Sequence, residues 1–319
     1  MNTEPFLAVL RSMRDSVRAL LRALRILPYA TTLLLLVCWV VYLASAALGL
    51  LGESAPLSSL FSVAANCLIP DQIQQLKGLH RIVAANFIHA SLGHILLNSM
   101  ALVHYGAFLE QRMGSVLFLW CALLFAPLVS IIHVLLAGFV DVLLHTSWSQ
   151  SCSVGFSAVL FAFIVIEVKR DQHEHRMPFT SYTYAASLHP WVLLLVGQVL
   201  LGSSASFLGH LSGILVGYLY NEGFLTRSCL LPPESLQSCI ELLLPESIYR
   251  SSRFFSHAAE GLPTFSTGLS LGAGYEQVAS GVPTQSDMRF PGRGHILGNS
   301  SSTLPPISRT ETETPVDKP

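Results

Sequence analysis

The chain has 319 residues, of which 51% are hydrophobic and only 12% are charged, against roughly 25% charged in an average soluble domain. The mean hydropathy of +0.54 therefore indicates a polytopic membrane protein, and the net charge of -1 gives no signature of nucleic-acid binding. The six cysteines include no C-x-x-C pair, so neither a zinc ribbon nor a disulfide scaffold is indicated. Cys67 and Cys152 could both face a lumen, but we do not expect a bridge between them.

Residues 1–27 are predicted to form an amphipathic cytosolic segment. Five arginines recur at steps of three or four, which places them on one face of a helix: Arg11, Arg14, Arg18, Arg22 and Arg25. Apolar residues such as Phe6, Leu10 and Val17 fall on or near another face. This pattern is typical of an interfacial helix that leads into a membrane span.

Six apolar stretches follow, and the first is long enough for the roughly 20 residues that a helix needs to cross a bilayer. We place them at about 29–51, 92–109, 115–138, 153–168, 187–204 and 206–222. The predicted fold class is therefore an all-α polytopic membrane protein with a six-helix core at 28–222. Residues 223–319 are rich in Ser, Thr, Pro and Gly, which predicts a disordered cytosolic tail.

Positive charges near the span ends predict the orientation, because they are enriched on the cytoplasmic side. With the N-terminus inside, the cytoplasmic side receives the five arginines and then Arg112, Lys169, Arg170, Arg176 and Arg227. The outside receives only Lys77 and Arg81. Both termini are then cytoplasmic, and Ser157 and His210 lie near the luminal ends of their spans.

Ser157 and His210 carry the chemistry that this arrangement suggests. A serine hydroxyl needs a base within hydrogen-bond reach to act as a nucleophile, and a serine–histidine dyad suffices if packing holds the imidazole in place. Gly213 and Gly217 follow His210 on its own helical face, where small residues let another helix approach closely. A lone serine at a helix N-terminus is, however, usually a cap or a packing residue.

His94 and Asn98 are spaced i, i+4 in the second span, so they share one helical face. Together with backbone N–H groups at the helix start near Ser157, they are candidate donors to a developing oxyanion. The alternative is that both residues are polar contacts between helices. His89 and His94 are five residues apart and do not stack as metal ligands, so we expect neither a metal nor a cofactor.

The same residues resemble the rhomboid intramembrane serine proteases over roughly 25–222. The resemblance rests on five ordered matches: FIHA at 87–90, H-x-x-x-N at 94–98, LEQRMGS at 109–115 with its Glu-x-Arg turn, GFS at 155–157, and G-H-x-x-G-x-x-x-G at 209–217. It implies a six-helix core with Ser157 as nucleophile and His210 as base. It also implies that Gly155, His94 and Asn98 serve oxyanion stabilisation.

Two positions depart from the family pattern. Ala158 stands where glycine often follows the serine, and His80-Arg81 stands where many members carry Trp-Arg. Because alanine is small, we expect helix packing at residue 158 to survive.

A second resemblance lies in the tail at 290–298, which is similar to the SHP-type motif F-x-G-x-G-x-x-L that docks proteins onto the AAA+ segregase known as valosin-containing protein. Phe290 and Leu297 would be apolar anchors, and Gly292 and Gly294 would allow an extended backbone. The combination is similar to the fungal Golgi rhomboids. It implies a Golgi membrane location, with the endoplasmic reticulum as the alternative, and substrates that include sterol-regulatory transcription-factor precursors.

The predicted function is that of an intramembrane serine endopeptidase that cleaves membrane-anchored proteins within or near their transmembrane segments. Its expected partners are transmembrane substrates, membrane lipid and the segregase, and not nucleic acid. The alternative is a derlin-like rhomboid pseudoprotease that binds transmembrane clients and passes them to the segregase. A small transporter fits less well, because the sequence shows no inverted repeat or broken helix.

Overall fold

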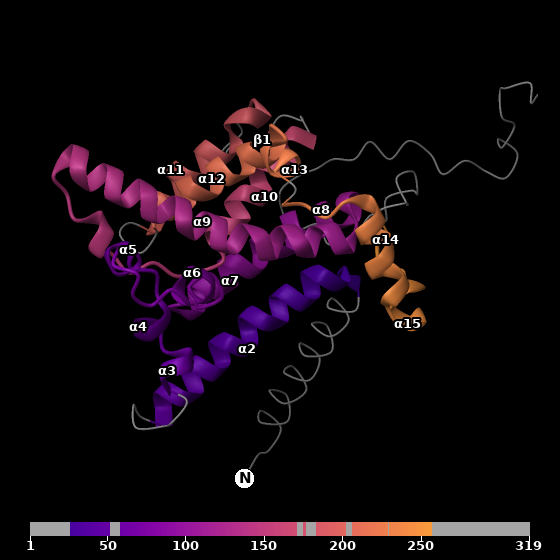
Figure 1. The fold of residues 1–319 in the computed structure, drawn as a ribbon, viewed down its shortest axis with the longest axis horizontal. Helices are drawn as coiled ribbons and strands as arrows, with labels where there is room; N and C mark the ends of the chain where they lie inside the picture. The colour runs from indigo at the N-terminus through magenta and orange to yellow at the C-terminus, as the bar shows by residue number, and fades with distance from the viewer. Residues whose placement is uncertain are drawn as a thin grey trace, which may run out of the picture. The chain divides into compact units, whose positions relative to one another are not determined.

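The computed structural model describes residues 26–51, 58–170, 175–176, 183–201, 206–228 and 230–256 (Figure 1). The predicted amphipathic pattern at 1–25 and the tail motif with Phe290, Gly292, Gly294 and Leu297 lie outside the described residues. The described part is mostly helical, as its apolar composition requires. The backbone N–H and C=O groups of a chain in lipid must be satisfied within the chain itself, and a helix does this within one segment.

The longer helices supply the framework: α2 (Tyr29–Leu51), α7 (Leu92–Ala101), α9 (Ser115–Leu144), α10 (Ser157–Arg170), α11 (His189–Leu201), α12 (Phe207–Asn221) and α14 (Glu234–Leu243). Shorter helices are α3 (Ser58–Phe61), α4 (Val63–Asn66), α5 (Pro70–Gln74), α6 (Arg81–Ala84), α8 (Ala107–Met113), α13 (Phe224–Arg227) and α15 (Glu246–Tyr249). The rest are the π-helix η1 (Leu102–Gly106), the 3-10 turns η2 (Trp148–Gln150) and η3 (Ala186–Leu188), and the antiparallel pair β1 (His175–Arg176) and β2 (Thr183–Tyr184).

Three helical stretches among the described residues are long and apolar enough to span a membrane. They are Tyr29–Leu50, Leu92–Met113 and Ser115–Leu144, and the second runs through α7, η1 and α8. They coincide with the first three predicted spans, although the second and third extend further. The other three predicted spans coincide with α10, α11 and α12, which have 14, 13 and 15 residues. Helix α10 begins at Ser157, a few residues after the predicted start near residue 153, because residues 151–156 are not helical.

Helix α10 is the centre of the described core. Every residue from 159 to 168 is buried, and α10 packs against α12, α9, α11 and the α7–η1–α8 segment (Figure 1). A helix that is apolar nearly all round is buried on all sides. The helix that begins at Ser157 is therefore held in position by the helices packed around it.

Helices α10 and α12 are in backbone contact, as the glycine spacing predicts. A Cβ atom on Gly213 would overlap the carbonyl oxygen of Ala158, and one on Gly217 would lie 2.6 Å from the Cβ of Val165. The expectation that Ala158 preserves helix packing is therefore confirmed. Close approach of this kind requires small residues at the crossing point.

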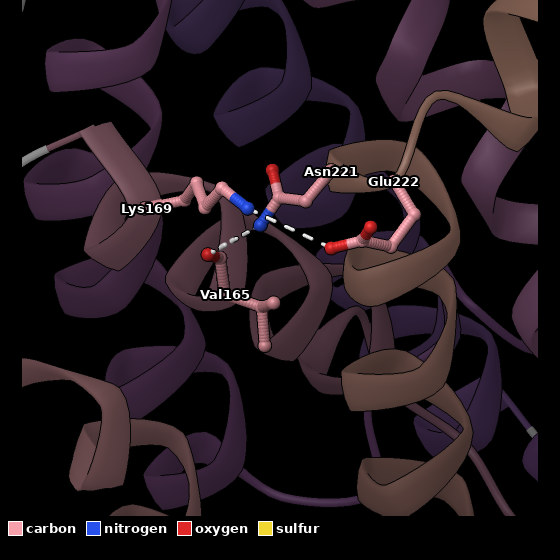
Figure 2. A network of polar contacts seen from close by, with 4 residues as sticks. All are labelled: Val165, Lys169, Asn221 and Glu222. Carbon is pink, nitrogen blue, oxygen red and sulfur yellow. Dashed lines mark hydrogen bonds and ion pairs between the residues drawn. The ribbon is translucent and has the colours of Figure 1, made fainter.

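The far ends of the same two helices are joined by polar contacts (Figure 2). Asn221 Nδ2 donates to the carbonyl oxygen of Val165 at 3.0 Å, and Lys169 Nζ lies 3.6 Å from Glu222 Oε1. The ion pair is more than half exposed and contributes little to stability. The hydrogen bond from the Asn221 side chain satisfies the backbone carbonyl of Val165, near the end of α10. Together with the glycines it fixes the relative register of α10 and α12.

Glu110 ties α2 to the turn between α8 and α9. The carboxylate is fully buried and accepts hydrogen bonds from the backbone N–H groups of Ala30 and Thr31, at 2.9 and 2.7 Å. It also accepts from the hydroxyls of Thr31 and Ser115. A carboxylate at a helix N-terminus satisfies otherwise unpaired N–H groups. The Glu-x-Arg turn therefore has a structural role at the start of α2.

The prediction of a disordered tail from residue 223 is wrong for residues 224–228 and 230–256. This segment forms α13, α14 and α15, and it returns to the Tyr29 end of α2 and the Ser115 end of α9 (Figure 1). Ser115 N donates to Phe255 O at 2.7 Å, and Phe255 N donates to Ser115 Oγ at 3.1 Å. The prediction averaged the Ser- and Pro-rich composition over the whole tail. It therefore missed a short segment whose helices are stabilised by tertiary contacts.

Arg253 anchors this segment, and we expect Arg253→Ala to destabilise the fold by about 2 kcal/mol. Its guanidinium donates to Leu27 O at 2.6 Å and to Thr32 Oγ1 at 2.9 Å, and it lies 4.4 Å from the centre of the Tyr29 ring. The measurement is the thermal unfolding midpoint of the purified protein. Arg250→Ala is the control, because that side chain is 77% exposed and pairs with Glu246 of the adjoining short helix α15. An equal decrease of the unfolding midpoint in Arg253→Ala and Arg250→Ala would contradict this anchoring role.

The expectation that Cys67 and Cys152 stay unpaired is also wrong. The structure joins them in a disulfide with a Cα–Cα distance of 5.4 Å, although they are 85 residues apart in sequence. No local pattern signals such a pair, because the fold alone brings the two loops together. Cys38 and Cys121 are buried free thiols, and Cys239 is an exposed one.

Candidate active site

Ser157 is the first residue of α10 and follows an extended segment that positions it. Gly155 has φ = +112°, a value that residues with a side chain rarely adopt, and its N–H donates to Ala85 O at 2.9 Å. Phe156 is buried, and its ring packs 5.7 Å from that of Phe87. The chain therefore turns at Gly155, anchors at Phe156, and presents the Ser157 hydroxyl at the helix start.

The Ser157 hydroxyl and the His210 imidazole are in hydrogen-bond contact. Ser157 Oγ lies 2.9 Å from His210 Nε2, and the hydroxyl donates when Nε2 carries no proton. The imidazole is 8% exposed and stacks on the Phe161 ring, with centroids 4.5 Å apart. Within the described part of the chain, His210 Nδ1 has no hydrogen-bond partner. Ring stacking and helix packing, rather than a carboxylate, hold this imidazole.

Ser206 sets the start of the helix that carries His210. Its hydroxyl caps α12 by accepting a hydrogen bond from Gly209 N at 3.2 Å. The same hydroxyl accepts from Ser153 Oγ at 3.0 Å, which links it to the segment that leads into Ser157. The approach to the nucleophile and the start of the histidine helix are therefore tied to each other directly.

His94 and Asn98 face Gly155 from α7. A Cβ atom on Gly155 would lie 2.6 Å from His94 Nε2 and 3.7 Å from Asn98 Nδ2, so both side chains lie beside the backbone that precedes Ser157. Ser91 caps α7 by accepting from His94 N, and Asn98 Nδ2 donates to His94 O at 3.1 Å. The structure thus brings together all five predicted site residues.

His89 is a neighbour of the site to which sequence reasoning gave no role. Its ring lies 5.1 Å from that of His94, and the residue is almost fully buried. Burial, with His94 as a second cause, lowers the pKa of His89 to about 4. This imidazole is therefore neutral near pH 7 and adds no positive charge beside His94.

A small cavity of about 30 Å³ adjoins Ser157 and His210, large enough for one or two waters. Polar residues that sequence reasoning missed line it: Asn86, Ser130, His133, Ser153 and Ser206. Asn86 Nδ2 donates to Ser130 Oγ at 3.0 Å, and His133 is 3% exposed. Ser130 and His133 are spaced i, i+3 within an apolar span, and this signal could have indicated them.

The departure at His80-Arg81 lies beside the disulfide. Arg81 Nη1 donates to Cys67 O at 2.8 Å and to Ala64 O at 3.2 Å, and His80 Nε2 lies 3.2 Å from Ala65 O. These contacts attach the loop that contains Cys67 to the start of α6. At this position the arginine thus has a structural role within the loop.

The sequence of this chain is similar to those of known proteins. The profile of a family described as "Rhomboid domain" matches residues 76–227. Rhomboid-like protein 15 of Arabidopsis thaliana is 32% identical over 306 residues, which cover 89% of this chain and 73% of that protein. Rhomboid-related protein 4 of Homo sapiens is 32% identical over 196 residues, and Rhomboid-type serine protease 2 of Neurospora crassa is 33% identical over 171. The chain spans 58% of the length of each of these last two.

Proposed function

The chain belongs to the rhomboid family of membrane proteins, and from this premise we propose that it is an intramembrane serine endopeptidase. The observation that carries the proposal is the 2.9 Å contact between Ser157 Oγ and His210 Nε2. A nucleophile and a base in contact, with His94 and Asn98 beside them, provide the groups that peptide hydrolysis needs. Polar residues are costly to keep between apolar helices without a purpose.

The reaction begins when Ser157 Oγ attacks the carbonyl carbon of the scissile peptide bond. His210 Nε2 takes the hydroxyl proton and delivers it to the leaving amine. The oxyanion develops beside Gly155, where His94 and Asn98 supply donors. A water then attacks the acyl carbon and gives a proton to His210, which returns that proton to Ser157 Oγ as the ester bond breaks and the acid product leaves. The adjoining cavity has room for such a water. Protection from bulk solvent strengthens each of these hydrogen bonds.

We further propose that α10, α11 and α12 complete a six-span core and that both termini are cytoplasmic. The asymmetry of lysine and arginine supports this orientation. The Cys67–Cys152 disulfide supports it independently, because such bonds persist in oxidising compartments, and both cysteines would then be luminal. A Golgi membrane, or the endoplasmic reticulum, offers such a lumen. Substrates would be single-span proteins, including sterol-regulatory transcription-factor precursors, cut near the luminal face.

The rival function is that of a pseudoprotease that binds transmembrane clients. The name of the Neurospora crassa relative states a serine protease, whereas the name of the Homo sapiens relative states no activity. A binding protein has no need for a hydroxyl in contact with an imidazole that stacking on Phe161 holds in place. The geometry of Ser157 and His210 therefore favours the protease.

The proposed tail partner is an AAA+ segregase that docks at 290–298 through Phe290, Gly292, Gly294 and Leu297. The support is the F-x-G-x-G-x-x-L pattern of the sequence. Phe290→Ala should abolish co-purification of the segregase while reporter cleavage continues. Unchanged co-purification would remove the docking proposal.

The test of the protease proposal is cleavage of a single-span reporter by the purified protein in liposomes. We expect two fragments, and mass spectrometry should map the cut near the luminal end of the reporter span. Intact reporter that co-purifies with the protein would favour the binding function instead.

A further inference from the structure

The Cys67–Cys152 disulfide joins the first loop to the segment that carries the nucleophile. Cys152 lies five residues before Ser157 and is exposed, whereas Cys67 is 1% exposed at the end of α4. The sequence pattern assigns this pair no function. Its position, so close to Ser157, makes it a candidate for a role in catalysis as well as in stability.

The bond continues into a short backbone pairing. Leu68 N donates to Ser153 O at 2.8 Å, and Ser153 N donates to Leu68 O at 2.9 Å. Two residues later, Gly155 N donates to Ala85 O at 2.9 Å. Residues 152–155 are thus attached to the first loop by one covalent bond and three hydrogen bonds. An isolated two-stranded pairing is marginal in water on its own.

The same segment reaches both members of the dyad. It leads through Phe156 into Ser157, and Ser153 Oγ donates to Ser206 Oγ, the cap of α12. His210 N in turn donates to Ser206 O at 3.0 Å. A displacement of residues 152–155 would therefore disturb the serine through the chain and the histidine through its helix cap.

The other side of the bond is fixed. Arg81 Nη1 donates to Cys67 O at 2.8 Å, and Cys67 N donates to Val63 O at 2.8 Å. The buried Cys67 sulfur is therefore a firm attachment point. Because Cys67 is held in place, the disulfide also restrains Cys152 and the residues that lead to Ser157.

We propose that the Cys67–Cys152 disulfide is a positioning element of the active site, which holds residues 152–155 so that Ser157 and His210 stay in reacting geometry. The inference rests on the proposed protease function. A misplacement of about 1 Å costs on the order of 10²-fold in rate. We therefore expect loss of the bond to lower kcat by about 10- to 100-fold, with KM little changed.

The experiment compares wild type, Cys152→Ser and Cys239→Ser in the liposome assay, well below the unfolding midpoint of each. Cys152→Ser leaves the buried Cys67 side chain in place, so no cavity is created. Cys239→Ser removes an exposed thiol of α14 and is the matched control. Reduction of the folded wild type by a water-soluble phosphine, which can reach the exposed Cys152, gives a second route should the variant fold poorly.

Hydrogen exchange provides a readout that does not depend on the protease function. Peptides that cover 151–157 should exchange faster in Cys152→Ser and in reduced wild type, while peptides from the middle of α9 should not. Wild-type kcat in Cys152→Ser, or unchanged exchange at 151–157, would overturn the inference. If the wild type cleaves no reporter, the protease proposal fails, and exchange alone decides whether the disulfide positions this segment.

Discussion

Replacement of Ser157 by alanine is expected to lower the rate of reporter cleavage by about 10⁴-fold or more, and His210→Ala should have an effect of similar size. The two side chains meet at 2.9 Å and act as one unit, because the hydroxyl is a poor nucleophile without the base. The double variant should therefore be hardly worse than either single variant. The measurement is the rate of reporter cleavage in liposomes by the two single variants and the double variant.

The matched control is Ser99→Ala in α7. The Ser99 hydroxyl accepts a hydrogen bond from Trp39 Nε1 at 3.0 Å and belongs to the contact between α2 and α7. This variant should keep most of its activity. Strictly additive losses for Ser157→Ala and His210→Ala, or cleavage that persists in both, would sink the dyad assignment.

Gly213→Ala is expected to damage both fold and activity. The new Cβ would overlap the Ala158 carbonyl oxygen and lie 2.9 Å from the Cβ of Phe161, whose ring stacks on His210. Because both contacts involve atoms close to the backbone of α10, α12 must move away. We expect a stability loss of about 1–3 kcal/mol and a rate loss of about 10²-fold or more.

Gly197→Ala on α11 is the control for this substitution. Nothing lies within 4 Å of the Cβ that it would add, and alanine favours a helix over glycine by up to about 1 kcal/mol. Thermal unfolding and kcat should therefore stay near wild type. If Gly213→Ala behaved like Gly197→Ala, the close contact between α10 and α12 would not control the dyad.

The sequence predicted those parts of the site that follow from helical spacing. Gly213 and Gly217 share a face with His210, and His94 shares one with Asn98, because residues three or four apart are neighbours on a helix. The order of the apolar stretches then placed Ser157 and His210 near the same ends of their helices. The structure brings these residues together as that reasoning required.

The parts that failed depend on contacts between distant segments. The disulfide partner of Cys67 is 85 residues away, and nothing near either cysteine indicates the pairing. The non-helical course of 151–156 follows from the positive φ of Gly155 and the pairing with Leu68, which override the apolar pattern. The helices α13, α14 and α15 of the tail depend on contacts of Arg253 and Phe255 with α2 and α9. Composition averaged along a chain cannot reveal such contacts.

The most direct test of the central claim is covalent labelling of Ser157 by a fluorophosphonate, which reacts with activated serines and needs no protein substrate. Mass spectrometry of the wild type should find one adduct, on Ser157, and His210→Ala should lose it although Ser157 is still present. Such a result would show that the imidazole activates this hydroxyl. A wild type that stays unlabelled at Ser157, or a His210→Ala variant that labels at the wild-type rate, would contradict the account.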